Sequence, residues 1–141
     1  IDGSNILDLY SGIGSFGLEC LSRKAKKVTF VEYDLSALTV LKENLIQLSV
    51  YNQARIINDK IEDFLNRDNK EKYRIFFLDP PFMDKEYFYN LELIKKNNLF
   101  EKKHIIIIHR EKNSNDDLQN LLNFSSVKIY GRSKIIFGTF N

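Results

Sequence analysis

A chain of 141 residues, 43% of them hydrophobic, is long enough to build one hydrophobic core, which excludes a disordered tail and a small disulfide-stapled fold. Lysine and arginine outnumber aspartate and glutamate by only 21 to 19, so an anionic partner would have to bind a local basic patch. A single cysteine argues against a disulfide framework and favours a reducing, cytoplasmic compartment. Apolar runs such as Ile105–Ile108 are far shorter than the ~20 residues of a membrane span, so no membrane partner is expected.

Strand-like and helix-like segments alternate along the chain. In chain order, the patterns predict a strand at Asn5–Leu9, a helix at Ser15–Arg23, a strand at Val28–Glu32, a helix capped by Asp34, a strand at Ala54–Asn58, a helix at Ile61–Arg67, a strand at Arg74–Leu78, a helix at Lys85–Asn97, a strand at His104–His109, a helix at Asp116–Phe124 and a hairpin of Val127–Tyr130 and Ile135–Phe140. Such alternation predicts an α/β fold with a mostly parallel sheet and helices on both faces. We expect residues 1–141 to form a single domain. Because the chain begins with Ile1 rather than Met, we also expect an N-terminal segment to be missing.

Half of the six glycines lie in one short turn between the first strand and the first helix, at Gly12, Gly14 and Gly17. Their spacing matches the Gly-x-Gly-x-x-Gly fingerprint of dinucleotide-binding proteins. Glu32 ends the second strand, where a carboxylate commonly accepts hydrogen bonds from a ribose diol. A dinucleotide would place its pyrophosphate on the helix N-terminus, whereas S-adenosylmethionine would bring a cationic sulfonium and an amino group to a carboxylate such as Asp8. Both cofactors remain open at this point.

A second polar site follows the third strand. Asp59 can accept a hydrogen bond from an adenine amino group, and Ile61 can pack on the adenine ring. Asp59 can equally serve as the N-cap of the helix that follows.

A third site follows the fourth strand, where the sequence reads Asp79-Pro80-Pro81-Phe82. Each proline restricts the residue before it to extended backbone, so we expect a rigid corner that presents the Asp79 carboxylate and free carbonyl groups. These acceptors suit an exocyclic amino group of a nucleobase, and Phe82 can stack on the base. No metal and no covalent nucleophile are needed, because a sulfonium is already activated toward attack.

These segments together resemble class I S-adenosylmethionine-dependent methyltransferases that act on amino nitrogens. The run from Gly12 to Arg23, followed by Val28-Thr29-Phe30-Val31-Glu32, resembles more closely the RsmD-type family of bacterial 16S rRNA guanine-N2 methyltransferases. The resemblance implies a Rossmann-like, seven-stranded sheet in the order 3-2-1-4-5-7-6 with the last strand antiparallel. It also implies a basic segment ahead of the first strand, which this sequence lacks.

The resemblance assigns roles to particular residues. The implied cofactor contacts to S-adenosylmethionine are Asp8, Tyr10, Gly12, Gly14, Gly17, Glu32, Asp59 and Ile61, and the implied catalytic residues are Asp79, Pro80, Pro81 and Phe82. The implied partner is 16S rRNA or the small ribosomal subunit, and we expect a monomer.

The basic residues expected to touch RNA phosphates can be chosen by their position relative to the strands of the sheet. Residues that follow strands lie at the same edge as the proposed site, and we expect them to form a phosphate-facing rim: Lys60, Lys85, Arg110, Lys112, Arg132 and Lys134. Basic residues that precede strands, such as Lys102 and Lys103, are expected at the opposite edge.

Three other functions remain as alternatives. A nicotinamide- or flavin-dependent oxidoreductase explains the glycine turn and Glu32 but gives Asp79–Phe82 no role. A non-catalytic RNA-binding factor could retain the same fold. An N6-adenine methyltransferase acting on DNA or RNA would use the same Asp-Pro-Pro-Phe sequence.

Overall fold

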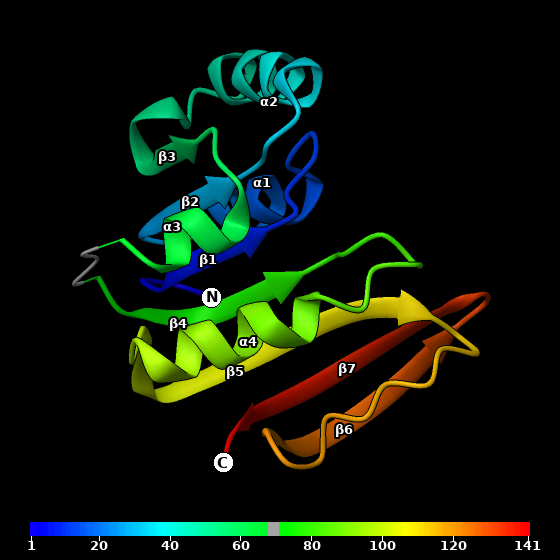
Figure 1. Cartoon of the computed structure of the whole chain (residues 1–141). Helices are drawn as coiled ribbons and strands as arrows, with labels where there is room; N and C mark the ends of the chain where they lie inside the picture. The colour runs from blue at the N-terminus through cyan, green and yellow to red at the C-terminus, as the bar shows by residue number, and fades with distance from the viewer. Residues whose placement is uncertain (68–70) are drawn as a thin grey trace.

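The protein is built around one seven-stranded sheet with the order β3-β2-β1-β4-β5-β7-β6 (Figure 1). The computed structural model describes residues 1–67 and 71–141. The strands are β1 (Asn5–Leu9), β2 (Lys27–Val31), β3 (Ala54–Ile57), β4 (Tyr73–Leu78), β5 (Phe100–Glu111), β6 (Leu122–Tyr130) and β7 (Ser133–Phe140). The first five pair in parallel, whereas β7 runs antiparallel to both β5 and β6. The predicted fold class and strand order are therefore confirmed.

Helices cover both faces of the sheet, as alternating strands and helices require. The helices are α1 (Ser15–Ser22), α2 (Leu35–Gln47), the short 3₁₀ helix η1 (Tyr51–Gln53), α3 (Ile61–Leu65) and α4 (Tyr87–Lys96). In Figure 1, α3 and α4 lie in front of the sheet and α1 lies behind it. No helix in residues 1–67 and 71–141 is long and apolar enough to cross a membrane.

The two faces of the sheet carry separate hydrophobic clusters because successive strand side chains point in opposite directions. On β1, Ile6 packs in the cluster that includes Leu41 of α2, while Leu7 and Leu9 pack in the cluster that includes Leu91 of α4. Burial on both faces explains why the central strands β1, β2 and β4 are mostly apolar.

One predicted helix, Asp116–Phe124, is wrong. Residues 112–121 form a loop, and Leu122 already begins β6, where it pairs with Phe140. Leu118, Leu121 and Leu122 are all buried, so their helix-like spacing records three anchors of a loop and a strand start in the core. The spacing of these leucines predicted one face of a helix, but the loop and the start of β6 bury the same side chains without forming a helix.

The hairpin and the strand before it are longer than predicted. β5 continues to Glu111 rather than ending at His109, and β6 and β7 are joined by only Gly131 and Arg132, since Tyr130 pairs with Ser133. These extra residues keep Arg110 inside the sheet, opposite Lys134.

Candidate cofactor site and catalytic loop

The turn between β1 and α1 depends on glycine at two positions. A Cβ at Gly14, which has φ of 89°, would lie 2.3 Å from Leu41 Cδ1, and a Cβ at Gly17 would lie 2.2 Å from Phe30 Cε1. Real side chains cannot approach this closely, so both positions must lack a Cβ for the turn and α1 to pack on β2 and α2. The close packing of Gly14 against Leu41 and of Gly17 against Phe30 thus fixes the shape of the predicted glycine turn.

Asp8 lies beneath this turn and is almost completely buried. Its Oδ2 accepts a hydrogen bond from the Gly17 backbone N–H at 3.2 Å, whereas its Oδ1 is buried and has no partner among the described residues. Burial raises the pKa of Asp8 to about 8; the Gly17 hydrogen bond opposes this rise, and the charges of Asp79 and Glu32 add to it. A buried acceptor without a donor carries a free-energy cost that a cationic ligand would relieve.

Glu32 ties the turn to the start of α2. Its Oε1 accepts from the Gly12 N–H at 2.7 Å, and its Oε2 accepts from the Asp34 N–H at 2.9 Å. The carboxylate is thereby fixed at the end of β2, and each of its oxygens retains lone-pair capacity for a ligand hydroxyl.

A cavity of about 490 Å³ opens beside Glu32. Of the predicted cofactor residues, Tyr10, Glu32, Asp59 and Ile61 line it. Its charged lining consists of five carboxylates and one lysine: Glu32, Asp59, Glu62, Asp84, Glu86 and Lys60. The cavity is therefore electronegative, which favours a cationic ligand over an anionic one.

Asp59 is not a helix cap, so the alternative prediction for this residue is wrong. The N-cap of α3 is Lys60, which makes no side-chain capping bond, and Asp59 instead forms an ion pair with Arg67. Asp59 and the buried Ile61 both line the cavity, as the cofactor prediction requires.

One wall of the cavity was missed by the sequence analysis. It is formed by residues of the β4–α4 loop and α4: Asp84, Glu86, Tyr89 and Asn90. The buried Asn90 side chain donates a hydrogen bond of 2.8 Å to the Tyr10 hydroxyl. Burial raises the pKa of Tyr10 above its ordinary value, and the charge of the Asp84 carboxylate raises it further. One sequence feature indicated this wall: Asn90 is a polar residue in the stripe of Tyr87, Leu91 and Ile94 that faces the core.

The Asp79–Phe82 segment leaves β4 beside the glycine turn, because Leu9 and Leu78 are register partners on neighbouring strands. The side chain of Asp79 is 45% exposed, Phe82 is 54% exposed and Pro80 is buried. The predicted free carbonyl groups are wrong for two residues: the Pro81 and Phe82 oxygens accept hydrogen bonds from Arg110 at 3.2 and 3.0 Å. Within the loop, Asp79 presents a carboxylate and Phe82 presents an exposed ring.

Comparison with known proteins identifies the family. The family model described as conserved hypothetical protein 95, that of the RsmD family, matches residues 1–139. The chain belongs to the RsmD family. The resemblance found in the sequence is thus confirmed.

Individual members agree with this assignment. A Haemophilus influenzae protein named ribosomal RNA small subunit methyltransferase D is 40% identical over 79% of this chain and 59% of its own length. A Buchnera aphidicola protein of the same name is 36% identical over 82% of this chain and 58% of its own. A solved Haemophilus influenzae structure superposes with a TM-score of 0.85 at 32% identity, covering 100% of this chain and 89% of that one. This chain spans about three fifths of the curated relatives' length.

In this RsmD-family chain, Arg110 does not belong to a phosphate-facing rim, which corrects the prediction. Its side chain is 1% exposed, its Nε donates to Asp116 at 3.1 Å, and its guanidinium lies 4.7 Å over the Tyr87 ring. Arg110 is buried because β5 continues through it and directs it to the same face as Ile106 and Ile108.

Lys134 is also held inside the protein rather than free to reach RNA. Its ammonium group donates to the Ser114 carbonyl and lies 3.5 Å from Asp116, and its side chain is only 16% exposed. Burial alone would raise the pKa of Asp116, but hydrogen bonds from Ser114 and Tyr87 and the charges of Arg110 and Lys134 bring it below its ordinary value. Asp116 is thus the shared counter-ion of both cations.

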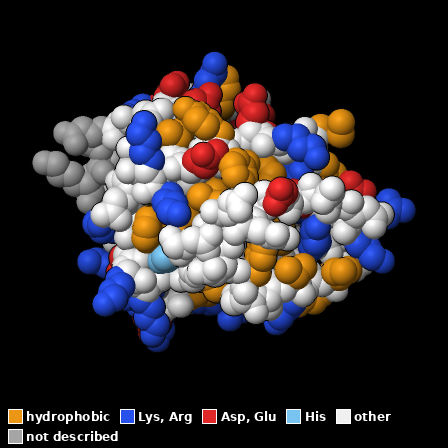
Figure 2. Space-filling model, turned by 60° about the horizontal axis from the view of Figure 1, so that its bottom comes forward, with side chains coloured by type: hydrophobic (Ala, Val, Ile, Leu, Met, Phe, Trp, Pro, Cys, Tyr) orange, Lys and Arg blue, Asp and Glu red, His pale blue; other side chains and the backbone are white. Residues whose placement is uncertain are grey.

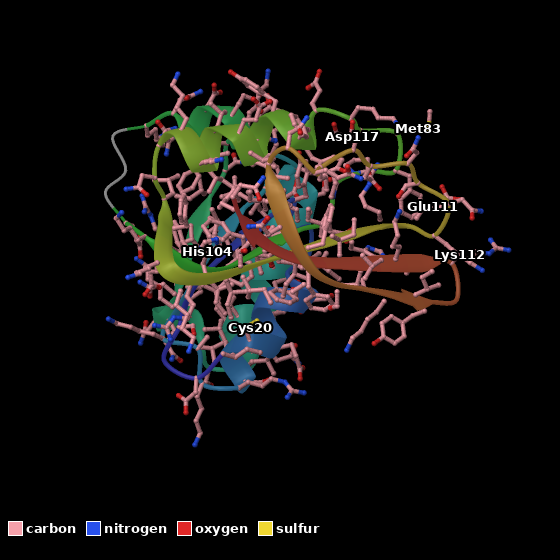
Figure 3. The ribbon with its side chains drawn as sticks, turned by 90° about the horizontal axis from the view of Figure 1, so that it is seen from below. Cys20, Met83, His104, Glu111, Lys112 and Asp117 are labelled. Carbon is pink, nitrogen blue, oxygen red and sulfur yellow. The ribbon has the colours of Figure 1, made fainter. Side chains whose placement is uncertain are left out.

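The remaining rim residues are exposed: Lys60, Lys85, Lys112 and Arg132. The Lys112 N–H donates to the Arg132 carbonyl at 2.7 Å, which holds the end of β5 against the hairpin turn. Figure 2 shows blue side chains at the right-hand end of the molecule, the end to which the β4 and β5 arrows point in Figure 1. In Figure 3, Met83 of the β4–α4 loop and Lys112 lie at this same end.

No group of three or more His, Cys, Asp or Glu side chains within the described part of the chain is arranged to hold a metal ion.

Proposed function

We propose that this protein transfers a methyl group from S-adenosylmethionine to the exocyclic N2 amine of a guanine in 16S ribosomal RNA. The observation that carries the proposal is the electronegative cavity together with the buried, unpartnered Asp8 Oδ1, beside a loop that presents Asp79 and Phe82. Relatives named ribosomal RNA small subunit methyltransferase D support the RNA substrate. The N2 position of guanine rests on the sequence resemblance.

The residues present fit S-adenosylmethionine. Asp8 would accept hydrogen bonds from its cationic amino acid end, Glu32 would hold the ribose diol, and Asp59 with Ile61 would hold the adenine. When bound, this cofactor supplies a methyl group on a positively charged sulfur; the amino nitrogen would attack the methyl carbon as the carbon–sulfur bond breaks, which releases neutral S-adenosylhomocysteine and one proton from the amine.

A dinucleotide fits these residues less well. The backbone N–H groups of Gly12 and Gly17, which a pyrophosphate would need, already donate to Glu32 and Asp8. Adding phosphate charge beside five carboxylates would be electrostatically unfavourable. This observation disfavours the oxidoreductase alternative.

The contribution of the protein to catalysis would be alignment. Asp79 would accept a hydrogen bond from the target amine and aim its lone pair, and Phe82 would stack on the base, a contact worth roughly 1–3 kcal/mol. The arginine beneath the loop, Arg110, holds the loop backbone while this happens. Correct placement of two reactants can supply several kcal/mol of barrier lowering, so no metal or nucleophilic side chain is required.

The test uses protein from the complete coding sequence and small ribosomal subunits that lack the modification. Labelled methyl should enter 16S rRNA, and nucleoside analysis should find N2-methylguanosine. Asp79→Ala should abolish transfer while leaving the Kd for S-adenosylmethionine unchanged by calorimetry. N6-methyladenosine as the product would overturn the guanine assignment, and binding of NAD without S-adenosylmethionine would overturn the enzyme class.

A further inference from the structure

His109 connects the proposed catalytic loop to the hairpin. It lies on β5, between Asp79 at the end of β4 and Ser133 at the start of β7, and these three strands are neighbours in the sheet. His109 Nδ1 lies 2.8 Å from Asp79 Oδ1, and His109 Nε2 lies 2.8 Å from Ser133 Oγ. The imidazole is 25% exposed and meets the Phe82 ring edge-on, with 6.4 Å between the ring centroids.

The chemistry of the three groups determines which atom donates and which accepts in each of the two hydrogen bonds. A carboxylate can only accept hydrogen bonds, so the proton between His109 and Asp79 belongs to Nδ1. In the neutral imidazole Nε2 is then an acceptor, and the Ser133 hydroxyl donates to it. Asp79 thereby selects the Nδ1–H tautomer of His109, and the Ser133 hydroxyl, which can donate to the free Nε2, fixes the orientation of the ring from the other side.

This arrangement leaves one oxygen of the proposed catalytic carboxylate for the substrate. Oδ1 of Asp79 is held by His109, and no described side chain or backbone group bonds Oδ2. An exposed aspartate otherwise rotates among several orientations, and each hydrogen bond to a fixed neighbour reduces that freedom.

Two consecutive residues of β5 therefore fix the loop from opposite faces of the sheet. Arg110 points to the face of Ile106 and Ile108 and holds the Pro81 and Phe82 carbonyl groups, while His109 points to the other face and holds the Asp79 carboxylate. Backbone and side chain of the loop are thus positioned by separate residues.

We propose that His109, oriented by Ser133, is a positioning residue that fixes the Asp79 carboxylate for the target amine. The proposal rests on the proposed function, because it assigns His109 a role in aligning the same reaction.

The key comparison is between two substitutions that each keep one nitrogen position. His109→Asn places an amide N–H near the position of Nδ1 and retains the donor to Asp79, whereas His109→Gln places its amide near Nε2 and loses that donor. We expect His109→Gln to lower kcat by roughly 10- to 100-fold, as misplacement of an aligned group does, without changing the Kd for S-adenosylmethionine. His109→Asn should retain kcat within about threefold of wild type, and Ser133→Ala should fall between the two.

The control is His104→Gln, at the other histidine of the chain, which lies on the same strand and accepts from the Phe140 N–H. It should keep wild-type kcat. Equal kcat values for His109→Asn and His109→Gln would overturn the proposal, and so would a loss of kcat in His109→Gln that is matched by a lowered melting temperature and weaker cofactor binding.

A spectroscopic test does not require activity. Two-bond ¹H–¹⁵N correlation spectra should show neutral His109 as the Nδ1–H tautomer, with the signal identified by its absence in His109→Gln. The Nε2–H tautomer would overturn the proposal. Failure of the proposed function would be seen separately, as the absence of methyl transfer by the wild-type protein.

Discussion

Asp8 is a carboxyl group that folding removes almost entirely from water. Its pKa of about 8, against an ordinary value of 3.8, means that the folded protein keeps a proton on Asp8 over a pH range in which the unfolded chain has lost it. The folded state therefore binds more protons between about pH 4 and pH 8, and the free energy of unfolding falls as the pH rises through this range.

The matching prediction uses Asp8→Asn in the absence of cofactor. Asparagine cannot ionise, and its side-chain oxygen can still accept from the Gly17 N–H. We expect the free energy of unfolding of the wild-type protein to fall relative to that of Asp8→Asn by up to about 1.4 kcal/mol per pH unit between pH 4 and pH 8. Urea denaturation at pH 5 and pH 8 measures the difference. Parallel pH profiles for the two proteins would show that Asp8 does not retain its proton.

At the scale of single elements, strand β5 positions the proposed catalytic loop through Arg110. The guanidinium reaches three backbone carbonyl groups, those of Pro81, Phe82 and Asp84, and also pairs with Asp116. Only a planar group with several N–H donors can serve all of these acceptors at once.

Arg110→Lys separates the shape of this group from its charge. Lysine keeps a cation near Asp116 but cannot donate in a fork, so we expect the loop to loosen and kcat to fall by about 10-fold or more. Because Arg110 is buried, the dependence of RNA affinity on salt should not change. An intact kcat with a salt slope reduced by about one would instead indicate a phosphate contact, as the sequence pattern predicts.

The elements also show what the sequence could and could not predict. The glycine turn and the Asp79–Phe82 corner follow from local patterns, since glycine and proline restrict the backbone near themselves. The order of the strands was implied by the resemblance to a family rather than by any local pattern. The role of Arg110 depends on partners distant in sequence: the loop carbonyl groups lie 28 and 29 residues earlier. The false helix at Asp116–Phe124 arose similarly, because the burial of Leu118, Leu121 and Leu122 is decided by the sheet they contact.

At the scale of the whole molecule, the position of the basic residues relative to the sheet matters more for RNA binding than the net charge does. With a formal charge of only +2, the protein would have to attract RNA through local groups. Lys112 and Arg132 are exposed beside the hairpin turn at the end where β4 and the parallel strands terminate, whereas Lys102 and Lys103 are exposed near the beginning of β5. The two pairs carry equal charge, one beside the end of β5 and the other near its beginning, so they form a matched comparison.

We expect the double substitution Lys112→Ala/Arg132→Ala to weaken RNA binding and to reduce the slope of log K against log salt by about one for each phosphate that the variant no longer neutralises. The control Lys102→Ala/Lys103→Ala removes the same charge from the other end, so it should leave both the affinity and the slope close to wild type. Titration of a labelled 16S rRNA fragment at several salt concentrations measures both quantities. Equal reductions in the two double variants would mean that RNA responds to net charge alone, and a larger reduction in the control would place the RNA surface at the opposite edge of the sheet. If only Lys112→Ala/Arg132→Ala reduces the slope, phosphates are held beside the hairpin turn, directly before Ser133, the residue whose hydroxyl orients His109.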